Sequence, residues 1–335
     1  MNINFNYERQ KIEYTSGYIF KGNNYRCSFI KYKSLYKNPA PGTEMVELYN
    51  YQPKGEVRAS TMILHGLGSS NIKFLLWLGP HLASAGVNTS ILILPGNYTR
   101  VEDKSVSGRS YLYPDVSLMY QFWEHAVVDV LTTIDLLEDE NLWKENSLLM
   151  GYCLGGMIST IVSALDHRIA HTLFMTTGGN IPKIMHQSPA TSFVRRLFAK
   201  KDFKADGLEN KELLYKEYGE QFPLVNTMEL DELLNSDGIH PLFKIDPLSY
   251  AHFIDKKKVT FIDAFFDSTL PIESRGDLYK LMEGAKRRIL PISHINWLPF
   301  SYFTAKYMLH KLEINDKVAK RALRKKEKIQ NPLQK

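Results

Sequence analysis

The distribution of apolar residues along the chain predicts an α/β fold. Short apolar or β-branched runs are typical of buried strands, and they fall at residues 58–64, 89–94, 147–152, 171–176, 259–265 and 288–292. Between several of these runs, apolar residues recur at three- and four-residue steps, which predicts helices over residues 73–85, 118–137 and 157–165. Strands alternating with such helices imply right-handed crossovers, so we expect a mostly parallel central sheet with helices on both faces.

The N-terminal segment, residues 1–57, breaks this alternation. It carries amphipathic runs separated by Gly and Pro turns, which suit antiparallel strands at a sheet edge, at residues 11–20, 26–32 and 44–51. We therefore expect this segment to extend one edge of the sheet.

A second interruption, residues 180–256, lies between two predicted core strands. It holds helical patterns punctuated by prolines and is too long for a simple crossover. We expect an inserted helical cap, with residues 58–179 and 257–313 forming the core. Apolar cap residues could line an acyl pocket or pack the cap onto the core, namely Ile184, Met185, Phe193 and Leu197.

Composition and charge narrow the classes of protein. The chain has 335 residues, 44% hydrophobic and 23% charged, which is typical of a globular protein and excludes disordered, collagen-like and coiled-coil classes. The net charge of +6 resides in the C-terminal tail, residues 314–335, which contains eight basic and two acidic residues. The remainder is formally neutral, so we expect no nucleic-acid partner. We expect the tail itself to be solvated and helical, with adhesion to an acidic partner or a membrane surface as the alternative.

Two cysteines are too few for a disulfide framework, and a reducing compartment suits them better. The N-terminus lacks a secretory apolar stretch, and no apolar run has the length of a membrane span. These features predict a cytoplasmic protein without a membrane span. They leave its oligomeric state open.

The strongest chemical motif follows the predicted strand at residues 147–152. Gly151, Cys153 and Gly155 form the pattern Gly-x-nucleophile-x-Gly at a junction between a strand and a helix. Such a nucleophile elbow lifts the central side chain out of the sheet, and its glycines avoid collisions with the neighbouring backbone. The alternative is that Cys153 has only a structural role, as a small buried residue at a strand end.

A nucleophilic thiol needs a base and a carboxylate, which follow the nucleophile in the order acid, histidine in this architecture. His294 comes just after the last core strand, and Asp267 follows the preceding one. The alternatives are a surface-loop histidine and a turn-forming Asp267. Asp263 is the second choice for the acid, since it lies inside an apolar run where an unpaired carboxylate is costly to bury.

The predicted strand at residues 58–64 ends in a glycine-rich turn, His65-Gly66-Leu67-Gly68. Such a turn can direct a backbone N–H at a developing oxyanion. We expect the N–H groups of Leu67 and Leu154 to form the oxyanion hole.

Arg100 and Arg109 lie in a polar loop and could bind a substrate carboxylate or phosphate through two hydrogen bonds. They could equally pair with the nearby acids Glu102, Asp103 and Asp115. No cysteine or histidine cluster has zinc spacing and no nucleotide-binding glycine motif occurs, so we expect neither a metal nor a cofactor.

The chain resembles the α/β-hydrolases. Its run GYCLGG at residues 151–156 is similar to the elbow of dienelactone hydrolases, which use Cys, Asp and His, and to the Gly-x-Cys-x-Gly-Gly box of polyhydroxyalkanoate synthases. The run LPGNYTR at residues 94–100 resembles a Leu-Pro-x-x-Tyr-x-Arg pattern of bacterial α/β-hydrolases. The resemblance implies acyl transfer through a thioester.

These observations together predict a hydrolase that acts on an ester, thioester or lactone of a small molecule through Cys153, His294 and Asp267. Two alternatives remain. An acyltransferase could use the same thiol if the cap excludes water, and a non-catalytic binding protein could keep the fold and its pocket.

Overall fold

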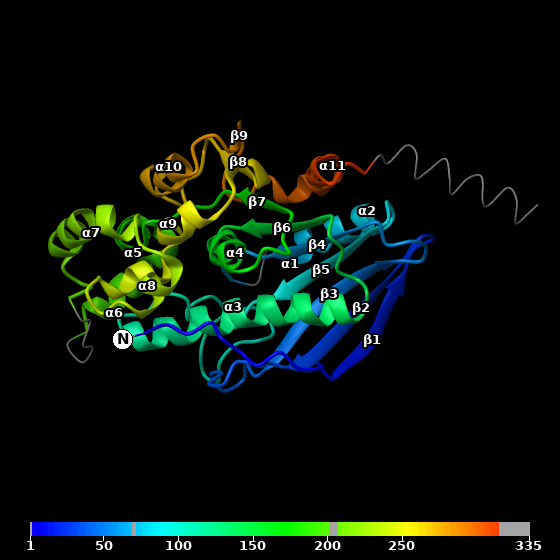
Figure 1. Cartoon of the computed structure of the whole chain (residues 1–335), viewed down its shortest axis with the longest axis horizontal. Coiled ribbons are helices and arrows are strands. Elements are labelled where there is room, and N and C mark those ends of the chain that lie inside the picture. Colours follow the sequence, from blue (N-terminus) through cyan, green and yellow to red (C-terminus); the bar gives the residue numbers. More distant parts are fainter. Residues whose placement is uncertain (1, 69–71, 201–206, 315–335) are drawn as a thin grey trace, which may run out of the picture.

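The computed structural model describes residues 2–68, 72–200 and 207–314, and within them the chain forms a single nine-stranded sheet (Figure 1). Its strands are β1 (Tyr14–Lys21), β2 (Tyr25–Lys33), β3 (Met45–Pro53), β4 (Ala59–Leu64), β5 (Val87–Ile93), β6 (Ser147–Tyr152), β7 (His171–Met175), β8 (Val259–Ala264) and β9 (Lys286–Leu290). The order is β1-β2-β3-β5-β4-β6-β7-β8-β9. The pairs β1–β2, β2–β3 and β3–β5 are antiparallel and the others parallel. The predicted α/β sheet is confirmed, and the strands at its N-terminal edge are antiparallel.

Helices cover both faces of this sheet. Tyr32 of β2 donates hydrogen bonds toward α3 (Val116–Asp139), whereas Tyr51 of β3 packs against Gly79 of α2 (Leu78–Ala83). Because Tyr32 is registered with Val46 and side chains alternate along a strand, Tyr32 and Tyr51 point to opposite faces. The helix α4 (Leu154–Leu165) packs against α3, and α11 (Ser301–Lys311) packs against α2.

The helix predicted over residues 73–85 is divided into α1 (Ile72–Leu75) and α2. Pro80 explains the interruption, because it has no N–H to donate to the carbonyl of Leu76 and its ring would collide with that carbonyl. The single helix expected there was wrong.

Between β7 and β8 the described chain contains only helical elements and loops. These are α5 (Ile181–Gln187), η1 (Pro189–Thr191), α6 (Ser192–Phe198), α7 (Lys211–Val225), α8 (Leu230–Asn235), η2 (Pro241–Ile245), α9 (Pro247–Tyr250), η3 (Ala251–Phe253) and η4 (Lys256–Lys258). Figure 1 shows α5 to α8 gathered at one end of the molecule. The chain then continues through α10 (Ile272–Leu281) and η5 (Leu298–Phe300). The cap boundaries stay a prediction, and the basic tail lies almost wholly outside the described residues.

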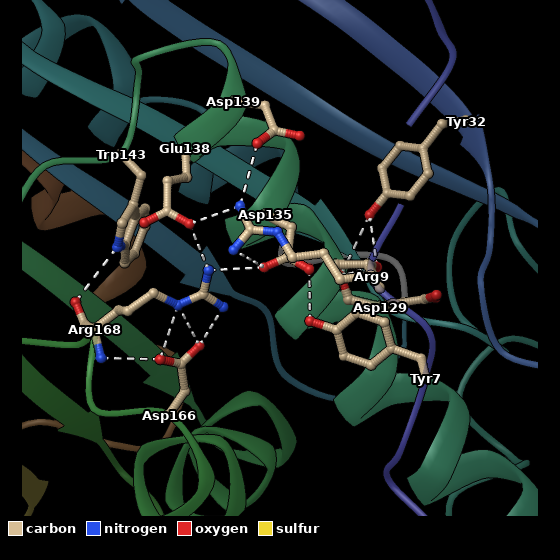
Figure 2. A network of polar contacts seen from close by, with 11 residues as sticks. Tyr7, Arg9, Tyr32, Asp129, Asp135, Glu138, Asp139, Trp143, Asp166 and Arg168 are labelled. Carbon is tan, nitrogen blue, oxygen red and sulfur yellow. Dashed lines mark hydrogen bonds and ion pairs between the residues drawn. The ribbon is translucent and has the colours of Figure 1, made fainter. Parts of the chain in front are cut away.

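A polar network fastens the N-terminal segment to the end of α3 (Figure 2). The Tyr7 hydroxyl donates to Asp135 at 2.6 Å, and Arg9 donates to Glu138 at 3.0 Å. From the other side, Arg168 pairs with Asp135 at 2.7 Å and with Asp166 at 2.6 Å. Asp135 therefore joins two segments that are remote in sequence.

Candidate functional site

Cys153 occupies the sharp turn between β6 and α4. Its backbone has φ 52° and ψ −113°, a conformation that L-residues rarely adopt and that stores strain. The Cys153 N–H donates to the Met175 carbonyl at 3.1 Å, and the Thr177 hydroxyl donates to the Cys153 carbonyl at 2.6 Å. These bonds hold the turn in place, and the residue is 7% exposed.

The glycines around this turn are required by close backbone approaches. A Cβ on Gly151 would lie 2.4 Å from the Gly155 carbonyl oxygen, and one on Gly155 would lie 2.3 Å from the Leu64 carbonyl oxygen. A Cβ on Gly156 would meet the Thr177 hydroxyl at 2.1 Å. No side chain fits at these positions, which is the geometry expected of a nucleophile elbow.

His294 and Asp267 meet beside the elbow. The His294 Nδ1 lies 2.8 Å from the Asp267 Oδ2, and the Asp267 side chain is fully buried. The other Asp267 oxygen accepts hydrogen bonds from the N–H groups of Thr269 at 2.8 Å and Leu270 at 3.0 Å. These bonds orient the carboxylate toward the imidazole.

The electrostatics couple this histidine to the thiol. Burial by itself lowers the pKa of His294, but the Cys153 sulfur and the hydrogen bond to Asp267 outweigh it and raise the pKa from 6.5 to about 10. Burial would raise the pKa of Asp267, whereas its hydrogen bonds with His294 and with backbone N–H groups bring that pKa below its ordinary value. Since Asp267 engages Nδ1, Nε2 is the nitrogen available to Cys153.

Tyr152 is a site residue that the sequence analysis did not identify. Its hydroxyl donates to the His294 carbonyl at 3.1 Å, and its ring lies 5.3 Å from the His294 ring and 5.0 Å from the Trp297 ring. Tyr152 therefore positions the loop that carries His294. Its place beside Cys153 in the elbow motif was the only available signal.

Asp263 does not face His294. It is buried and paired with two cations, Arg275 and Arg287, the second at 2.5 Å. Its burial is therefore compensated, which corrects the premise that it would be unpaired. Arg275 also approaches Asp267, with 3.7 Å between Nε and Oδ2.

The glycine-rich turn after β4 borders the elbow. A Cβ on Gly66 would lie 3.2 Å from the Cys153 Cβ, and Gly68 has φ 84°. His65 accepts the Leu94 N–H at Nε2, at 3.0 Å, and its Nδ1 lies 2.6 Å from the Gly66 carbonyl. Burial lowers the pKa of His65 to about 4, so this neutral ring fixes the turn. Leu154 begins α4, where N–H groups have no partner within the helix. The oxyanion roles of Leu67 and Leu154 stay predictions.

Arg100 lies in the protein interior. Its guanidinium pairs with Asp129 at 2.7 Å and donates to the carbonyls of Ile93 and Thr43, both at 2.7 Å. The side chain is 1% exposed. The substrate contact suggested for Arg100 is not supported, because its guanidinium already binds groups of the fold, and the expected pairing with loop acids is not formed either.

Arg109, by contrast, lines a cavity of about 610 Å³ between the loop after β5 and α6. Its guanidinium carbon lies 6.0 Å from the ring centre of Phe193. Phe193 and Leu197 also line this cavity, whereas Ile184 and Met185 are buried in the core. Of the four apolar cap residues considered from the sequence, two therefore pack in the core and two line a cavity.

Two further features concern the described residues alone. They contain no group of three or more His, Cys, Asp or Glu side chains arranged to hold a metal ion. None of their helices combines the length and apolar character that a bilayer crossing requires.

Comparisons with known proteins rest on structure, since no protein-family model and no curated protein matches the sequence. A cold-adapted esterase from an Arctic intertidal metagenomic library matches with TM-score 0.53 and 13% identity over 93% of this chain and 99% of the other. Acetyl xylan esterase 1 from Thermoanaerobacterium matches with TM-score 0.55 and 17% identity over 91% and 89%.

The acylaminoacyl peptidase of Pyrococcus horikoshii matches with TM-score 0.55 and 12% identity, over 87% of this chain and 42% of that one. These likenesses, together with the strand order and the elbow, establish the α/β-hydrolase fold predicted from the sequence.

Proposed function

We propose that the protein is a hydrolase of ester, thioester or lactone substrates, with Cys153 as nucleophile, His294 as proton carrier and Asp267 as the orienting carboxylate. The observation that carries this proposal is the strained cysteine at the β6–α4 turn beside a histidine that is hydrogen-bonded to a buried aspartate. The solved structures that share the fold include proteins named as esterases, which agrees with ester chemistry.

In the first half-reaction the Cys153 sulfur attacks the substrate carbonyl. A bond forms between sulfur and carbon, and the carbonyl electrons move to oxygen, where the N–H groups of Leu67 and Leu154 stabilise the charge. Because the pKa of His294 is raised to about 10, the imidazole holds a proton at neutral pH. It gives this proton to the departing alcohol or thiol as the tetrahedral intermediate collapses to a thioester.

The second half-reaction needs His294 as a base. Once the sulfur is acylated, the charge that helps to raise the pKa of His294 is gone, so that pKa falls toward its ordinary range. The neutral imidazole can then take a proton from water as the water attacks the thioester. Collapse expels the Cys153 sulfur, which regains the ion pair, and releases the acid.

The test is intact-mass detection of an acyl adduct after incubation with a panel of p-nitrophenyl esters and acyl thioesters. We expect one adduct, located on Cys153 by peptide mapping, and no turnover by Cys153→Ala. Cys27→Ala is the matched control, because Cys27 is buried in β2 and burial raises its pKa to about 11. Unchanged turnover in Cys153→Ala would refute the proposal.

Product analysis separates the acyltransferase alternative. Release of free acid without any added acceptor supports hydrolysis. An acyl-enzyme that persists in water and discharges only onto an added amine, thiol or alcohol would identify an acyltransferase instead.

A further inference from the structure

The cavity lined by Arg109 has an unusual balance of charges. Four cationic side chains and one carboxylate line it, namely Lys104, Arg109, Arg196, Lys200 and Glu102. Within the described residues none of these four cations forms an ion pair with a carboxylate. A concave surface that holds several uncompensated cations attracts anions, and arginine matches phosphate oxygens through two parallel hydrogen bonds.

The same cavity has an apolar side. Leu118 and Phe122 from α3 and Phe193 and Leu197 from α6 line it. A ligand that fits both surfaces combines an apolar stem with an anionic end. This composition disfavours an inorganic ion as the sole occupant.

The loop that carries Arg109 touches the turn beside Cys153. A Cβ on Gly108 would lie 2.9 Å from the Gly68 nitrogen and 3.1 Å from the Leu67 side chain, so the loop that carries Arg109 packs on the glycine-rich turn. Asn97 strengthens this contact, since its Oδ1 accepts the Gly68 N–H at 3.0 Å. The loop that supplies Arg109 to the cavity therefore also contacts the turn of the predicted oxyanion hole.

The strand order indicates how far the strand end at the cavity lies from the strand end at Cys153. Pro95 and Gly96, which line the cavity, follow β5, whereas Cys153 follows β6, and β4 lies between these strands. Two strand spacings amount to about 10 Å. A ligand whose stem has about this length can span the distance between the two strand ends.

We propose that this cavity binds a phosphate group of the acyl substrate, held about 10 Å from the carbonyl carbon that Cys153 attacks. The inference rests on the proposed function of Cys153 and adds the substrate class to it: acyl esters or thioesters whose apolar stem ends in a phosphate. Arg109 and Arg196 bind the phosphate, and Lys104 and Lys200 add positive potential.

The kinetic test compares two acetyl thioesters of equal length, those of 6-mercaptohexyl phosphate and 6-mercaptohexanol. We expect kcat/KM to be about tenfold or more higher for the phosphate. The double variant Arg109→Gln/Arg196→Gln should remove this preference, so that kcat/KM for the phosphate falls to the value for the alcohol. Lys216→Gln is the matched control, because this exposed lysine of α7 does not line the cavity. Equal kcat/KM for both thioesters in the wild type would overturn the inference.

A binding measurement tests the phosphate site independently of whether Cys153 is the nucleophile. Titration calorimetry of Cys153→Ala with 6-mercaptohexyl phosphate, protected as its methyl thioether, should show binding that weakens about tenfold in the Arg109→Gln/Arg196→Gln background. The carboxylate analogue should bind more weakly. Undiminished binding in the double variant, or equal binding of the carboxylate, would overturn the assignment even if Cys153 is shown to be acylated.

Discussion

Two buried aspartate–histidine pairs occur among the described residues, and their surroundings differ. Asp267 meets His294 at 2.8 Å, while Asp129 meets His125 at 3.2 Å, one turn apart on α3. In the second pair Arg100 also binds the carboxylate, at 2.7 Å, and the Ser34 hydroxyl donates to it. In the first pair the neighbouring cation, Arg275, stays at 3.7 Å.

The difference lies in how each aspartate is compensated, and it separates a pair with a structural role from the pair to which we assign a catalytic role. Arg100 neutralises Asp129, so that pair serves the packing of α3 against the sheet. Asp267 is neutralised mainly by His294 itself, which leaves the imidazole charged and next to a thiol.

Asp267→Asn should lower kcat by about 10²–10⁴-fold, because the amide no longer holds the imidazole in its orientation and charge state. Steady-state kinetics on the best ester of the panel measures the effect, and far-UV circular dichroism checks the fold. Asp263→Asn offers a nearby comparison, since Asp263 contacts Arg275 and Arg287 instead of His294. Activity retained by Asp267→Asn would remove Asp267 from the mechanism.

Asp129→Asn should lower the free energy of unfolding by about 3–5 kcal/mol, since it leaves the buried Arg100 without its counter-charge. Urea denaturation measures this loss. The double change Arg100→Met/Asp129→Leu should recover most of it, because both charges are then absent. If the single variant is as stable as the wild type, Arg100 and Asp129 are not a compensated pair.

The two pairs should respond to opposite extremes of pH. The raised pKa of His294 means that its contribution to stability is full below pH 6.5 and is lost as pH rises through about 10. Burial would raise the pKa of Asp129, but His125 and Arg100 outweigh burial and lower that pKa to about 2. The contribution of Asp129 to stability is therefore full above pH 3.8 and is lost as pH falls toward 2. Urea midpoints across pH for the wild type, His294→Gln and Asp129→Asn report the two losses. Parallel pH profiles for the two variants would contradict the assignment.

Arg168→Gln should have the smallest effect, a loss of about 1 kcal/mol with unchanged activity. Its side chain pairs with three carboxylates but is 22% exposed, so solvent weakens these ion pairs relative to fully buried ones. Urea denaturation beside Asp129→Asn measures the contrast. If Arg168→Gln lowered the free energy of unfolding as much as Asp129→Asn does, burial would not determine how much an ion pair contributes to stability.

The elements of the core could be predicted because periodicity and turn chemistry are local. The runs at residues 147–152 and 259–265 correspond to β6 and β8. The glycines around Cys153 indicated the turn between β6 and α4. The pairing of Arg100 with Asp129 could not be predicted, since 29 residues separate them and no local pattern encodes the contact.

The same limit applies to the site. Chain order singled out Asp267 and His294, whose contact the structure describes. Tyr152 was overlooked because its hydrogen bond to the His294 carbonyl spans 142 residues. The cationic cavity likewise joins a loop after β5 to α6, two segments whose proximity depends on how the helices between β7 and β8 fold back.

The network around Asp135 has a consequence for biosynthesis. Tyr7 and Arg9 bind partners 128 and 129 residues later in the chain, so neither residue has its partner until α3 has been synthesised. Closing so long a loop is entropically costly. Tyr7 and Arg9 can therefore reach their native positions only after the strands β1 to β5 have been synthesised.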